Sequence, residues 1–259
     1  MEVHAHTHTA RKKWTHYLWE FLMLFLAVFC GFLAENQREH YVEHQREKQF
    51  MITMLDDLKS DTVLLNATIK DWNFVNESID SVANAIQFPV AGTDLIKIYS
   101  HLNNALNYWS FRYNDRTIAQ LKNSGAFRLI REKEVANKIV AYDQLNNDAI
   151  VIIKDQRNSF YETVVGLRNK IFDQQIIYTI RKRFGVKPVP VSESLMIDSM
   201  LSKSDIPLSP ESQAALLFEF RNALLAYRTD YRNLEWGYDT TRQSINELIS
   251  LIKKEYHLE

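Results

Sequence analysis

The chain has 259 residues, and its 31 Lys and Arg against 32 Asp and Glu give a formal net charge of −1. A nearly neutral chain has no broad basic surface, so we expect no nucleic acid among its partners. With only 6 Gly and 5 Pro, tight turns are few, which disfavours sandwiches, barrels and Rossmann-type folds. We therefore predict an all-α protein built from a few long helices.

Residues 1–13 form a short tail with alternating histidines and a basic end. His4, His6 and His8 can chelate Zn²⁺, Cu²⁺ or Ni²⁺ in a flexible chain, so they are candidate metal ligands. The tail has no fixed geometry, so we favour a disordered polar tail without a metal.

The segment 14–34 is predicted to be a transmembrane helix. Residues 21–34 read FLMLFLAVFCGFLA and carry no charge, and aromatic side chains typical of a headgroup belt precede them (Trp14, Tyr17, Trp19). The whole segment meets the length of about 20 residues that a membrane span needs. Glu20 then lies near one interface, and the sharper alternative is a coupling carboxylate within the membrane. Cys30 is the only cysteine, which excludes a disulfide within the chain.

A cleaved signal peptide is the rival interpretation, because a basic stretch followed by an apolar run is its usual layout. Cleavage after Ala34 would place the bulky Phe32 where a small residue is needed. Lipoprotein processing fails in the same way, because Phe29 precedes Cys30. We therefore expect an uncleaved anchor.

The basic residues on the two sides of the span predict its orientation. Residues 11–13 are three contiguous basic residues next to the span, whereas those beyond it are scattered (Arg38, Arg46, Lys48). The positive-inside rule then places the N-terminus in the cytoplasm and the large domain outside the cytoplasmic (inner) membrane. Ala27, Gly31 and Ala34 share one face of the span, and small residues at this spacing allow a transmembrane dimer.

Residues 35–50 are almost wholly polar and predict a solvated juxtamembrane helical stalk, or one strand of an oligomer. Within them His40, Glu43 and His44 match H-x-x-E-H, the inverted zinc-protease motif. On a helix the two histidines lie one turn apart and could hold Zn²⁺, while Glu43 could polarise a water. No third ligand signature follows, so we favour a solvated helix over a metal site, and expect no cofactor.

Residues 51–259 are predicted to form an all-helical domain with breaks near 89–92, 185–190 and 205–210. Apolar residues at steps of three and four predict helices at the start of this domain and from about 132 to 172. Ser209 and Pro210 are a good N-cap and first helical residue for the last helix, whose stripe from 217 to 252 persists over about five heptads. Such a helix is typical of a bundle or coiled coil.

Charged residues beside these stripes are interpreted as solvated faces. Asp56, Asp57 and Asp61 belong to the first helix of the domain. Residues 181–183, Arg-Lys-Arg, are interpreted as a basic helix end favoured by the helix dipole rather than as a binding patch.

The chain resembles an uncharacterised family of single-pass membrane proteins of Bacteroidetes, classed as a domain of unknown function. The resemblance rests on the apolar FLMLFLAVFCGFLAEN after a short basic N-terminus, on MLDDLKSD at 54–61, and on LKNSG at 121–125 followed by a helix. It covers roughly residues 11–150 and implies an anchor followed by helices. It supplies no activity, cofactor or catalytic residue.

No nucleophile elbow, P-loop or dinucleotide fingerprint occurs in the sequence. We therefore expect a membrane-anchored, non-enzymatic helical protein that acts as a scaffold or partner-binding accessory protein at the cell envelope. Its expected partners are the lipid bilayer and either a second copy or another envelope protein. The alternatives are a sensory ligand-binding module with a separate signalling partner, and a metal-binding protein or metallohydrolase using His40, Glu43 and His44.

Overall fold

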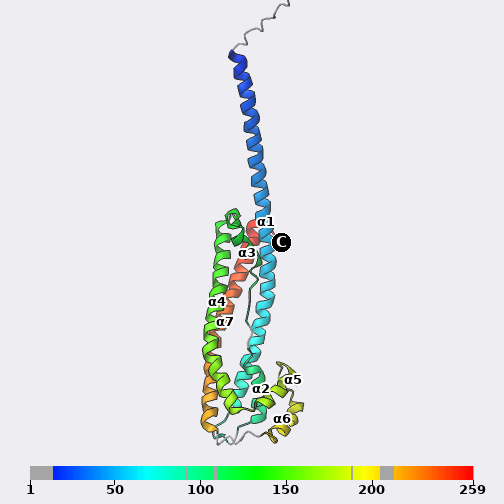
Figure 1. Cartoon of the computed structure of the whole chain (residues 1–259), viewed down its shortest axis with the longest axis vertical. Coiled ribbons are helices and arrows are strands. Elements are labelled where there is room, and N and C mark those ends of the chain that lie inside the picture. The colour runs from blue at the N-terminus through cyan, green and yellow to red at the C-terminus, as the bar shows by residue number, and fades with distance from the viewer. Residues whose placement is uncertain (1–13, 91–92, 108–109, 188, 205–212, 259) are drawn as a thin grey trace, which may run out of the picture.

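The computed structural model describes residues 14–90, 93–107, 110–187, 189–204 and 213–258. Within these residues every regular element is helical, which confirms the predicted all-α class. Three long helices, α1, α4 and α7, run lengthwise, and shorter elements gather at the two ends of the bundle that they form (Figure 1).

Helix α1, Trp14–Ala85, is a single helix of 72 residues, about 108 Å long at ~1.5 Å per residue. No Gly or Pro occurs between Phe32 and Phe88, so no residue in that stretch favours a break. The first part of α1 projects beyond the bundle (Figure 1), and its buried residues begin at Glu47. The bundle therefore begins inside the range 35–50 that was predicted to be a solvated stalk.

Helices α4 (Lys133–Ile171) and α7 (Ala214–Tyr256) complete the bundle, and α7 packs along both α4 and α1. The predicted apolar stripe of α7 is buried at its described positions, namely Leu217, Phe220, Leu224, Tyr227, Tyr238, Thr241, Ile245, Leu248 and Ile252. Periodicity over a long helix thus identified the buried face correctly. The cap predicted at Ser209 and Pro210 lies outside the described residues.

The end of the bundle remote from the projecting part carries the short helices α2, α5, η3 and α6 (Figure 1), which span Leu95–Ala105, Gln174–Phe184, Val191–Glu193 and Ser194–Leu201. Asp94 caps α2 by accepting a hydrogen bond from the Lys97 amide at 3.0 Å. The rings of Tyr99, Phe172 and Phe220 pack edge to face at 5.5 and 5.2 Å, and they join α2 to the α4–α5 junction and to α7. Residues 181–183 form the exposed last turn of α5, as predicted.

At the opposite end lie α3 (Arg116–Asn123) and the 3₁₀ helix η2 (Ala126–Leu129). Gly125 joins them with φ of +65°, a left-handed conformation that glycine adopts without strain. The extended residues 110–115, here called the strap, lead into α3 along the bundle (Figure 1). Phe111 of the strap is buried, with its ring 6.5 Å from that of Tyr238 on α7.

Candidate functional site

The projecting part of α1 presents large apolar side chains that no other part of the described chain covers. Trp14, Trp19 and Phe21 are each more than 60% exposed, and the most apolar stretch of the helix has none of its residues buried. Burying such side chains against protein or lipid is worth about 1.5–3 kcal/mol each. By length and composition this is the one described helix that could span a membrane.

Glu47 lies where α1 enters the bundle, and its side chain is only 1% exposed. Its Oε1 accepts hydrogen bonds from the Arg131 amide and from the Tyr256 hydroxyl, both at 2.7 Å. The Arg131 guanidinium also donates to the carbonyl of His40 at 3.2 Å. This cluster therefore ties the start of α4 and the last turn of α7 to the point at which α1 leaves the bundle.

Asp57 and Asp61 lie one turn apart on α1, and each is only 1% exposed. Asp61 accepts hydrogen bonds from the backbone N–H of Asn114 and from the Tyr142 hydroxyl, at 2.7 Å each. Asp57 accepts from the side chains of Asn114 and Arg116 and from both the amide and hydroxyl of Thr117. The two carboxylates hold the strap and the start of α3 against α1, and the interpretation of Asp57 and Asp61 as a solvated face is wrong.

Burial raises the pKa of the Asp61 carboxyl, and the hydrogen bonds from Tyr142 and Asn114 offset part of that rise. A carboxyl whose pKa is higher in the folded state binds its proton more tightly when folded. Its contribution to stability is therefore greatest below the unfolded pKa of about 3.9 and declines as the pH rises through the folded pKa.

Replacing Asp61 with the isosteric Asn is expected to remove this pH dependence. The free energy of unfolding of the native chain, relative to that of Asp61→Asn, should increase as the pH falls from 7 towards 4. Urea denaturation of the full chain in a non-ionic detergent measures the difference, with Asp56→Asn as the control at an exposed neighbour. Parallel pH profiles for the native chain and Asp61→Asn would contradict the assignment.

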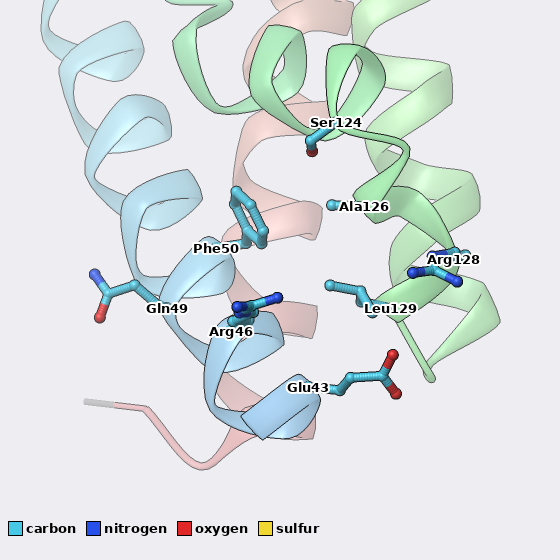
Figure 2. A pocket seen from close by; sticks show the side chains of 8 residues that line it. All are labelled: Glu43, Arg46, Gln49, Phe50, Ser124, Ala126, Arg128 and Leu129. Atoms are coloured by element: carbon cyan, nitrogen blue, oxygen red, sulfur yellow. The ribbon is translucent and has the colours of Figure 1, made fainter. Parts of the chain in front are cut away.

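A pocket of about 410 Å³ opens between α1 and the α3–η2 turn (Figure 2). Apolar side chains form part of its lining, and charged and polar side chains form the rest. The lining residues are Glu43, Arg46, Gln49, Phe50, Ser124, Ala126, Arg128 and Leu129. Arg46 comes from α1 and Arg128 from η2, so the two arginines lie on different walls of the pocket (Figure 2). In the described part of the chain neither has a hydrogen-bond or ion-pair partner.

The residues of the H-x-x-E-H motif do not converge on one site. The Nδ1 atom of His44 lies 3.4 Å from Oε2 of Glu47, whereas Glu43 lines the pocket. Throughout the described ranges, no group of three His, Cys, Asp or Glu side chains is placed to hold a metal ion. The other candidate metal ligands, His4, His6 and His8, lie outside the described residues.

The predicted transmembrane packing residues, Ala27, Gly31 and Ala34, are exposed on the projecting part of α1. Among the described residues, no atom outside its own helix lies within 4 Å of the position that a β-carbon on Gly31 would occupy, so this face is open. Glu20 lies one turn from His16, with Oε1 3.4 Å from Nε2. The aromatic residues predicted for the headgroup belt, Trp14, Tyr17 and Trp19, are likewise exposed.

Sequence reasoning did not find the pocket or the buried acids. Arg128 is separated from Arg46 by more than 80 residues, and no short motif joins them. No protein-family model, curated protein or solved structure matches the chain.

Proposed function

We propose that this chain is a membrane-anchored, non-enzymatic helical protein that holds or senses a partner at the outer face of the cytoplasmic membrane. The observation that carries the proposal is the continuity of α1, whose uncovered apolar start and buried second half belong to one helix of 72 residues. A continuous helix holds the bundle at a fixed distance from the membrane because no flexible linker intervenes.

The Glu47 cluster supports this role. It joins α4 and the end of α7 to α1 at the base of the bundle through buried, charge-assisted hydrogen bonds. When the bundle moves, the projecting part of α1 therefore moves with it, because the two are rigidly connected. The contiguous basic residues 11–13 favour the cytoplasm for the N-terminus, which puts the bundle outside.

A membrane-impermeant, amine-reactive crosslinker applied to intact cells tests both location and role. We expect a reproducible crosslinked species in which the full chain is joined to an envelope protein or to a second copy, because the bundle carries exposed lysines such as Lys59 and Lys70. Mass spectrometry of the recovered species identifies the attached chain. Crosslinking that requires permeabilised cells, or no crosslinked species at all, would contradict the proposal.

A further inference from the structure

We infer that the pocket between α1 and η2 binds a small amphipathic monoanion, a carboxylate attached to an apolar body, drawn from the aqueous phase. The inference deepens the proposed function, because it assigns a ligand to the anchored bundle and rests on that anchoring for the ligand's source.

The charge of the lining favours an anion with a single negative charge. Arg46 and Arg128 contribute two positive charges and Glu43 one negative charge, which leaves one positive charge to be balanced. Arg131 cannot serve this purpose, because Glu47 already engages it. Guanidinium groups pair with carboxylates through two parallel hydrogen bonds, which is the strongest common recognition of that group.

The apolar part of the lining favours a ligand that is more than an inorganic ion. Phe50 on α1 and Ala126 and Leu129 on η2 line the same pocket as the two arginines (Figure 2). The volume of about 410 Å³ falls in the range of about 300–1,000 Å³ typical of small-molecule sites. A ligand with both an apolar body and a carboxylate therefore uses all parts of the pocket.

The pocket is preformed. Its distance from the membrane indicates that the ligand comes from the aqueous phase rather than from the lipid. Arg131 follows η2 closely and is fixed to α1 by its bonds to Glu47 and to the His40 carbonyl, so the two walls are held together. Arg46 lies twelve residues further along the helix than Ala34, which is about 18 Å. The headgroup layer extends only about 5–8 Å beyond the hydrocarbon. A lipid headgroup therefore does not reach the pocket.

Isothermal titration of the full chain in phosphatidylcholine nanodiscs with 3-phenylpropionate tests the inference, with empty nanodiscs as the blank. We expect saturable binding that weakens at least tenfold in Arg46→Gln and in Arg128→Gln. Arg38→Gln, which changes an exposed arginine on the same helix outside the pocket, should bind as the native chain does. Propionate and 3-phenylpropan-1-ol, which lack the apolar body and the charge respectively, should each bind at least tenfold more weakly.

Equal binding of either analogue, no binding of 3-phenylpropionate, or no effect of the two pocket substitutions overturns the inference.

Replacing part of the phosphatidylcholine with phosphatidylglycerol distinguishes a ligand taken from water from an anionic lipid. Unchanged binding is expected for a ligand taken from water, whereas competition would show that an anionic lipid occupies the pocket and overturns the aqueous source. A chain that enters nanodiscs but fails to bind leaves the proposed anchoring intact, and a chain that fails to enter them contradicts the anchoring itself.

Discussion

Replacing Asp57 with alanine is expected to lower the free energy of unfolding by about 2–6 kcal/mol, because two buried donors lose their acceptor at about 1–3 kcal/mol each. The Asp57 carboxylate is buried and accepts from the Asn114 amide group at 2.8 Å, the Arg116 guanidinium at 2.6 Å, and the amide and hydroxyl of Thr117 at 3.0 and 2.5 Å. Truncation leaves Thr117, which is fully buried, without an acceptor for these two donors. Domains of this size are stable by only about 5–15 kcal/mol, so the loss is a large fraction of the total.

Urea denaturation of the full chain in a non-ionic detergent, followed by near-ultraviolet circular dichroism, measures the effect. Asp56→Ala is the matched control, because Asp56 is the adjacent residue of the same helix and is exposed. An exposed substitution of this kind is expected to change stability by less than about 0.5 kcal/mol. Exposed substitutions scatter over about 1 kcal/mol in total. A loss of stability for Asp57→Ala that lies within about 1 kcal/mol of the loss for the control would therefore contradict the structural role of the carboxylate.

The long helices were predictable because each buries one face over many turns. The helix expected from about 132 to 172 extends from Lys133 to Ile171, and apolar spacing over that length leaves little freedom of register. Helix α5, by contrast, was not predicted as a separate helix after α4. No Gly or Pro marks the junction at Phe172, and the break is set by Asp173, which caps α5 by accepting from the Gln175 amide at 2.8 Å.

The buried acids were not predictable, because their partners lie more than 50 residues away along the chain. Asp56 and Asp57 are adjacent in the sequence, but Asp57 faces the strap and the start of α3 and is buried, whereas Asp56 is exposed. The same holds for the pocket, whose walls on α1 and η2 come from segments that lie far apart in the sequence. The apolar start of α1 was predictable because a membrane span depends on local composition alone.

Introducing aspartate at the centre of the apolar segment is expected to abolish its integration into membranes. Leu24 is the midpoint of the predicted span 14–34, and Val28 lies one turn further on. An aspartate at the centre of a span costs about 2.5–3.5 kcal/mol, so the two together exceed what the remaining apolar side chains can offset. The matched control is Gln37→Asp with Tyr41→Asp, which places the same charges at the same spacing on the exposed helix beyond the span. Aspartates there are expected to leave integration unchanged.

Alkaline carbonate extraction of membranes that contain the full chain tests whether residues 14–34 anchor the protein in the bilayer. The native chain and the Gln37→Asp, Tyr41→Asp control should remain in the membrane pellet, whereas the Leu24→Asp, Val28→Asp variant should move to the supernatant. Release of the native chain by carbonate, or retention of the Leu24→Asp, Val28→Asp variant in the pellet, would contradict a membrane anchor at residues 14–34.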